Sequence, residues 1–298
     1  MQNLPFVISK NTTGKLRPIL YFIALLFSLW PSFAMAQGPS QVFIFQSANI
    51  YAHPNSNLNI FSDISHSGTL VSYDNALINF YATVWQNNEE SRLADESPRG
   101  IDGIGGVFRF SNLKNLSQRI RTIKSFPFNG FPNIQIDNAS NVIADNGNLH
   151  INRNLHFANG NLILNNVDVN IGLAGTGTIT GYSHKNFIVT GSAITGGGLI
   201  RNTAGTPMEL VYPIGTALTS YTPLTINYTG IAQSIKFRVA DNLYNKLNFP
   251  EYVNKTWIMK TYVVDPSSKM DINLQHNSAD EGIEYYRNGG EAYVTRYD

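Results

Sequence analysis

From Phe126 onward, short apolar runs return at steps of about six to seven residues, and this regularity constrains the fold more than any other feature of the chain. Asn and Gly, which tolerate the left-handed backbone of tight corners, stand between the runs. The runs are Ile134/Ile136, Val142, Leu149/Ile151, Leu155/Phe157, Leu162/Leu164 and Val167/Val169/Ile171, and the corners are Asn138, Asn146-Gly147, Asn159-Gly160, Asn165-Asn166 and Gly172. Three steps make a period of about 20 residues, the length of one coil of a parallel β-helix. We therefore predict a β-solenoid over residues 37–198, whose coils form a core by stacking.

Asn and Gly at the corners leave a second interpretation open. Asn146-Gly147 and Asn159-Gly160 are also favoured dipeptides for two-residue hairpins, so an antiparallel meander fits the same pattern. We favour the solenoid because the alternation continues with no long polar connection. In a solenoid, Asn side chains at repeated corners can form hydrogen-bonded ladders.

Residues 199–298 have longer and more aromatic segments than the preceding region. Leu224–Tyr228 and Ile235–Val239 alternate apolar and polar residues, as half-buried antiparallel strands do. Several such strands within about 100 residues predict an antiparallel β-sandwich. The whole protein is therefore predicted to be all-β, with a domain boundary after Gly196-Gly197-Gly198. The chain ends in mid-strand at Asp298, so we expect the sandwich to be truncated.

The N-terminus resembles a secretory signal peptide. Lys10, Lys15 and Arg17 precede an apolar run from Ile19 to Trp30, and Ala34-Met35-Ala36 fits the small-x-small cleavage rule. The apolar core of about 12 residues is short for a membrane span. We expect residues 1–36 to be removed between Ala36 and Gln37, leaving a secreted or outer-surface protein with no integral membrane segment.

Composition narrows the possible functions. Charged residues make up 14% of the chain, the net charge is +1 and cysteine is absent. Without a basic block, the electrostatic footprint of a nucleic-acid-binding protein is missing. Without cysteine, disulfides, thiolate metal sites and cysteine nucleophiles are excluded.

The residues that could perform chemistry are scattered. The six histidines form no HxH or HExxH pattern, and no acidic calcium loop is present, so we predict no metal and no cofactor. His150 and His156 are expected to be polar surface residues on successive strands. The acids of the loop around residues 86–106 are expected to serve solvation, and the solenoid acids to serve turns. Those groups are Glu89, Glu90, Asp95 and Glu96 in the loop, and Asp137, Asp145 and Asp168 in the solenoid.

Aromatic side chains are the better candidates for ligand contact, because Tyr and Trp stack on sugar rings and anchor protein contacts. Trp257 is expected to lie in the core of the sandwich. Tyr285 and Tyr286 are consecutive, so in a strand one of them must leave the core. The predicted ligand-contact residues are Tyr244, Tyr252, Tyr285 and Tyr286.

Short motifs in a shared order resemble those of large secreted surface proteins of Bacteroidetes bacteria. They include a segment like the family's "FPVGT … Y.P". The motifs are Ser67-Gly68-Thr69-Leu70, Trp85-Gln86-Asn87, Gly106-Val107-Phe108-Arg109-Phe110, Gln118-Arg119-Ile120, Phe131-Pro132-Asn133-Ile134, Tyr212-Pro213-Ile214-Gly215-Thr216, Tyr221-Thr222-Pro223-Leu224, Trp257, Ile272-Asn273-Leu274-Gln275-His276 and Ala279-Asp280-Glu281. The resemblance implies a modular protein exported by type IX secretion. It also implies a C-terminal sorting domain, which this chain lacks, so we expect a fragment of a longer gene product.

These observations favour a secreted or cell-surface structural module with adhesin-like behaviour and no catalysis of its own. An extracellular glycan or another cell-surface molecule is the expected partner. Two alternatives remain open. The sandwich could be a carbohydrate-binding module of a polysaccharide-processing protein, or the solenoid could be a polysaccharide lyase or glycosidase, for which two carboxylates or a calcium site would be needed.

Overall fold

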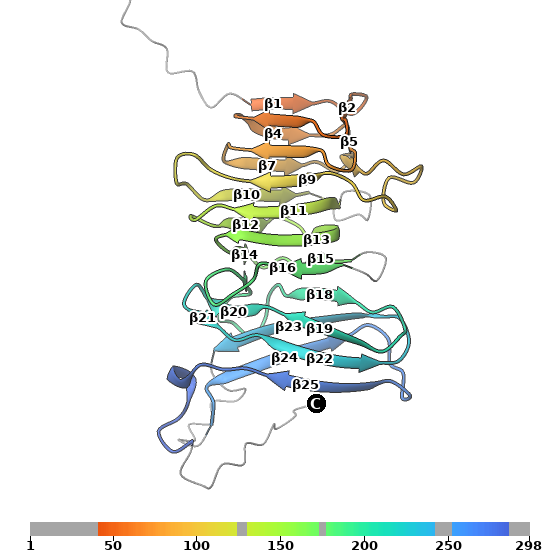
Figure 1. Ribbon diagram of the computed structural model, residues 1–298. Helices are drawn as coiled ribbons and strands as arrows, with labels where there is room; N and C mark the ends of the chain where they lie inside the picture. Colours follow the sequence, from red (N-terminus) through yellow and green to blue (C-terminus); the bar gives the residue numbers. More distant parts are fainter. Residues whose placement is uncertain (1–40, 124–129, 173–176, 242–251, 286–298) are drawn as a thin grey trace, which may run out of the picture. The chain divides into compact units, whose positions relative to one another are not determined.

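The computed structural model describes residues 41–123, 130–172, 177–241 and 252–285 (Figure 1). These residues lie in one compact unit that begins at Gln41. The described part is all-β, with one 3-10 turn, η2 (Ser278–Asp280), and no α-helix. The predicted signal peptide and its cleavage site at Ala36 and Gln37 lie outside the described residues.

Strands follow one another closely along the chain. Their bounds are β1 (Gln41–Ile44), β2 (Asn49–Ala52), β3 (Asn57–Ile60), β4 (Asp63–His66), β5 (Thr69–Ser72), β6 (Leu77–Phe80), β7 (Val84–Asn87), β8 (Arg92–Ala94), β9 (Val107–Phe110), β10 (Gln118–Thr122), β11 (Phe131–Asp137), β12 (Val142–Asp145), β13 (Leu149–Asn159), β14 (Leu162–Leu164), β15 (Val169–Ile171), β16 (Thr178–Thr180), β17 (Ile188–Val189), β18 (Leu199–Asn202), β19 (Met208–Tyr212), β20 (Ile214–Ala217), β21 (Ser220–Tyr221), β22 (Leu224–Thr229), β23 (Ser234–Asp241), β24 (Lys255–Thr261) and β25 (Lys269–Leu274).

Parallel pairing between successive coils confirms the predicted solenoid, which makes about seven turns. One sheet has the order β1-β4-β7-β10-β12-β14-β17-β20-β21, another runs from β3 through β6, β9, β11, β13, β15 and β18, and β2-β5-β8 forms a third. The register Val142↔Leu162 steps by the predicted period of about 20 residues. The antiparallel meander is wrong, because Asn146-Gly147 and Asn159-Gly160 join strands that do not pair with each other.

The corners form where the sequence predicts them. Asn146, Asn166, Gly160 and Gly172 all have positive φ, a conformation that Asn and Gly adopt at low cost. At Gly160 a side chain would also collide with the neighbouring coil, because a Cβ would lie 1.9 Å from the carbonyl oxygen of Asn138. These residues let the chain turn sharply while the coils stay at the spacing of a hydrogen-bonded sheet.

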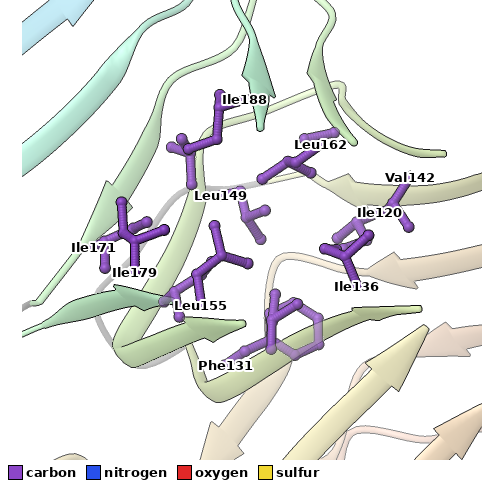
Figure 2. Packing of buried hydrophobic residues seen from close by; sticks show 14 of the residues in the cluster. Ile120, Phe131, Ile136, Val142, Leu149, Leu155, Leu162, Ile171, Ile179 and Ile188 are labelled. Carbon is purple, nitrogen blue, oxygen red and sulfur yellow. The ribbon is translucent and has the colours of Figure 1, made fainter. Parts of the chain in front are cut away.

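Rows of apolar side chains in register fill the solenoid. Val142, Leu162, Ile188 and Ile214 pair in succession along one sheet and are all fully buried. Figure 2 shows part of this packing, with Val142 and Leu162 among the labelled side chains. Burying each such side chain contributes roughly 1.5–3 kcal/mol. A single coil would leave its row exposed, so the stack, and not the coil, is the stable unit.

Antiparallel strands take over at the C-terminal end. β23 pairs antiparallel with β18 and β24, while β19, β22 and β25 form a separate three-stranded antiparallel sheet. The boundary predicted after Gly198 falls inside the compact unit, and both long parallel sheets continue beyond it. β18 still pairs parallel with β15, and β20 with β17.

Candidate functional site

Two of the four predicted ligand-contact tyrosines lie on neighbouring segments. An isolated bridge joins Val253 to Glu281, and the Gly282 amide donates to the Tyr252 carbonyl oxygen at 2.8 Å. Tyr252 is 39% exposed, whereas Tyr285 is half-buried. The structure therefore brings these two segments together. Tyr244 and Tyr286 lie outside the described residues.

Tyr285 packs against a histidine that sequence reasoning did not connect with it. The rings of His276 and Tyr285 meet edge to face with centroids 5.3 Å apart. Nε2 of His276 lies 3.1 Å from Oε1 of Glu281. This contact holds the Tyr285 ring beside the imidazole, and the strongly exposed Ile283 lies between Glu281 and Tyr285 in the chain. The result is a small surface with both apolar and polar side chains, which suits shallow contact with a partner.

Trp257, expected in the core of the sandwich, is partly buried and packs against the hydrophobic core from β24. Its indole Nε1 donates to the Thr222 carbonyl oxygen at 3.3 Å. Tyr228 is fully buried, and its hydroxyl donates to the Ile231 carbonyl oxygen at 2.8 Å. These two rings serve packing and are not available as a binding platform.

The exposed aromatic rows lie on the first two coils, where sequence reasoning placed no site. His53 and Tyr73 stack with ring centroids 5.7 Å apart, and Tyr51 stacks on His53 at 6.5 Å. On another corner, Phe61 and Tyr81 stack at 5.0 Å with an interplanar angle of 12°. Tyr51 is 54% and Phe61 67% exposed. One signal could have found both rows: His53 and Tyr73, and likewise Phe61 and Tyr81, are separated by one coil of about 20 residues.

Register explains why these rings stack. β2 and β5 pair with Ala52 opposite Ser72, so the residues that follow, His53 and Tyr73, leave the sheet at the same corner. Neighbouring strands lie about 4.8 Å apart, a spacing that suits parallel rings. The rows therefore present ring edges and one open face along consecutive coils.

The acids of the 95–106 loop do not serve solvation, which corrects the prediction for Asp95 and Glu96. Asp95 is only 2% exposed and accepts from the amides of Ser97 and Gly103 at 2.9 and 2.7 Å. Desolvation raises the pKa of Glu96, but backbone N–H donors, including those of Ile104 and Gly105, outweigh it, so the pKa is lowered overall. Both carboxylates shape the loop. Of the other two acids predicted to serve solvation, Glu90 is exposed and accepts a hydrogen bond from the Gln46 side chain, and Glu89 is exposed.

The sequence predicts that the solenoid acids serve local turns, and this is wrong: Asp137 and Asp145 pair with cations of the neighbouring coil, and Asp168 pairs with a cation on β23. Asp137 accepts two hydrogen bonds from Arg109, at 2.9 and 2.6 Å. Asp145 pairs with Arg119 at 2.5 Å and with Arg121 at 3.2 Å. Asp168 pairs with Lys236 at 2.5 Å and accepts from the Gly198 amide at 2.8 Å. Each of these three carboxylates is engaged by a cation.

Asparagine side chains do bond between coils, but at the corners this is seen for one pair, Asn141 and Asn161, and not as a ladder of the predicted corner residues. Nδ2 of Asn161 donates to Oδ1 of Asn141 at 3.1 Å. Within the strands, Asn79 donates to Asn59 at 2.9 Å and Asn154 to Asn133 at 2.8 Å. These side-chain hydrogen bonds join successive coils outside the apolar core, so they stabilise the stack in addition to the core packing.

Histidines occupy different environments. His66 is fully buried, and desolvation lowers its pKa to about 4, although a hydrogen bond with Asn87 opposes the shift. His150 and His156 lie on one strand, β13, and not on successive strands as predicted. His156 is exposed, with Nδ1 3.0 Å from Oγ1 of Thr180, whereas burial lowers the pKa of His150. They do not form one polar surface row.

The described ranges contain no group of three or more His, Cys, Asp and Glu side chains that could hold a metal ion. None of the described segments forms a helix long and apolar enough to span a membrane. Comparison of the chain with family models, with curated proteins and with solved structures finds no match in any of the three. The inference about function therefore rests on the geometry of this molecule.

Proposed function

We propose that this protein is a secreted or cell-surface structural module with adhesin-like behaviour and no catalysis of its own. The β-solenoid acts as a stiff spacer, and the C-terminal antiparallel strands form the predicted sandwich and serve as a contact domain. The resemblance to Bacteroidetes surface proteins and type IX secretion belongs to the same proposal. The expected partner is an extracellular glycan or another cell-surface molecule, bound by shallow polar and aromatic contacts.

The use of the solenoid carboxylates as ties between coils is the observation that carries this proposal. Asp137, Asp145 and Asp168 each pair with a cation 24 to 68 residues away in sequence. A lyase or glycosidase would need carboxylates free to exchange protons or to attack a sugar. Side chains arranged in this way support a scaffold.

A turnover assay tests the proposal. The purified protein is incubated with a panel of acidic and neutral polysaccharides, and reducing ends and unsaturated products are measured. We expect no product, and we expect Asp145→Asn to lower the free energy of unfolding without changing that result. Product formation that a single carboxylate substitution abolishes would instead establish the lyase or glycosidase alternative.

The exposed aromatic rows favour a second candidate function, glycan binding on the first two coils. Tyr51, His53 and Tyr73 form a stacked series on one corner, and Phe61 and Tyr81 form another. Open aromatic faces stack on the apolar faces of sugar rings. The sequence placed the carbohydrate-binding alternative in the C-terminal strands, whereas this second candidate function places it on the solenoid.

Pull-down on insoluble glycans separates the two locations. If the rows bind sugar, Tyr51→Ala and Phe61→Ala should each weaken saturable binding at least about threefold, since sugar stacking on one ring is worth on the order of 1 kcal/mol. Tyr252→Ala is the matched control, because it removes an exposed tyrosine at the C-terminal end. Loss of binding only in Tyr252→Ala would instead indicate that the glycan site lies at the predicted tyrosines of the C-terminal end.

A further inference from the structure

Within the described part of the chain, the first coil pairs along one side of its three strands only. β1, β2 and β3 each stand last in the order of their sheets, so no other described strand lies on their outer side. The unpaired N–H and C=O groups of such edges are templates for pairing with another chain. Here three edges belong to the same coil, Gln41–Ile60, and end the solenoid together.

This coil lacks the features that usually protect an edge. Residues 41–62 contain no Asp, Glu, Lys or Arg, and the one proline, Pro54, lies outside the strands. Large apolar side chains are exposed on and beside β1: Val42 at 42%, Phe43 at 58% and Phe45 at 72%. Natural edges are commonly blocked by charges, prolines or bulges, so an edge coil with neither charge nor proline in its strands is suited to a partner.

The edges at the opposite end differ. β24 carries Lys255 and Lys260, and β25 carries Lys269 and Asp271. β21, which ends the first sheet, is only two residues long. A head-to-tail contact would place the uncharged coil against these short or charged edges. Among the described strands, the uncharged edges that match the first coil in length are therefore its own, in another copy.

We propose that the first coil docks onto the first coil of a second copy, forming a head-to-head dimer around a two-fold axis. A two-fold axis perpendicular to the solenoid makes facing edge strands run antiparallel, so open N–H and C=O groups of one copy pair with those of the other. Such an interface is isologous and closes at two subunits. Because residues 41–62 contain no Asp, Glu, Lys or Arg, no like-charge pair forms between the facing edge strands.

Dimerisation does not depend on the proposed adhesive function, and the two can fail separately. Sedimentation velocity of the full chain over a wide concentration range measures the association. We expect a dimer, and we expect Phe43→Lys with Asn57→Lys to raise its dissociation constant more than tenfold, because like charges would then face each other. Met259→Lys with Ile272→Lys is the matched control on β24 and β25 and should leave association unchanged.

Far-ultraviolet circular dichroism of every variant checks that the fold persists. Disulfide crosslinking gives a second measurement, and it does not introduce a charge at the edge. Single-cysteine variants are suitable because the chain has no cysteine of its own. Phe43→Cys should form a disulfide-linked dimer under mild oxidation much faster than Ile272→Cys. Three results would each overturn the proposal. They are a monomer at all concentrations, equal crosslinking of the Phe43→Cys and Ile272→Cys variants, and a Met259→Lys with Ile272→Lys variant that no longer forms the dimer.

Discussion

The parallel coils and the last two antiparallel strands, β24 and β25, bury their residues to different extents, whereas β22 and β23 between them and the coils are buried as the coils are. β4 and β9 alternate half-buried and buried residues, so every second side chain enters the core. In β25 no residue is fully buried, and in β24 only Lys255 is. A coil inside the stack has neighbours on both sides, whereas β24 and β25 are edges. Position in the stack, more than composition, determines how much each strand contributes to stability.

The largest expected difference between the two regions concerns their tryptophans. Trp85 is fully buried and packs edge to face on Phe80 and Phe108, at 5.5 and 5.6 Å. Trp85→Ala should lower the free energy of unfolding by about 3–5 kcal/mol, the usual cost of such a cavity. Trp257→Ala, at a half-buried site, should cost less than half as much. Chemical denaturation measures both, and equal losses would mean that the C-terminal strands are packed as tightly as the coils.

The next effect in size is a pH dependence that resides in the coils. Burial lowers the pKa of His66 in the folded protein to about 4, below its ordinary value of 6.5, so the unfolded chain binds the proton more tightly. The stability of the folded protein that depends on a neutral His66 is therefore fully present above pH 6.5 and is lost as the pH falls from 6.5 toward 4. The loss at pH 4 should be about 3 kcal/mol.

Thermal unfolding of the wild type and of His66→Gln between pH 7 and pH 4 measures this effect. The difference between the two proteins should shrink or reverse as the pH falls. If His66→Gln also kept the wild-type profile, the acid sensitivity would have to come from other groups.

A smaller effect on the free energy of unfolding is expected from the ion pairs that join successive coils. The Asp145 side chain is 9% exposed and pairs with Arg119 and Arg121, so Asp145→Asn should cost about 1–3 kcal/mol. Asp102 pairs with Arg99 at an exposed site, and Asp102→Asn should cost at most about 1 kcal/mol. Urea denaturation of both variants compares them. Equal costs would remove the special role of the pairs between coils.

Local signals predicted the coils well because corners are local. Asn146, Gly160 and Asn166 adopt positive φ for reasons that lie within one or two residues of each, and the period follows from counting between them. The sequence could not show that β18 and β20 still pair in parallel beyond Gly198, because the partner of a strand is set by register across the whole stack. Tertiary pairing there extends the solenoid past a change in composition.

Side chains with distant partners were the hardest to predict. Asp95 lies in a stretch rich in polar residues, yet its burial depends on backbone amides that fold back from Ser97 and Gly103. Asp137 resembles an ordinary turn residue until Arg109 of the neighbouring strand is placed beside it. The aromatic rows were visible in principle as a repeat of one coil length, but only the stacked register shows that the rings touch.

Native-state hydrogen exchange measures the opening free energy of each strand and therefore tests whether the coil stack is the stable scaffold. We expect amides of β11 to β15 to exchange last and together, through global unfolding of the stack. Amides of β24 and β25 should exchange earlier, through local opening at the C-terminal edge. Protection in β24 and β25 equal to or greater than that in β11 to β15 would contradict the view that the coil stack is the stable scaffold.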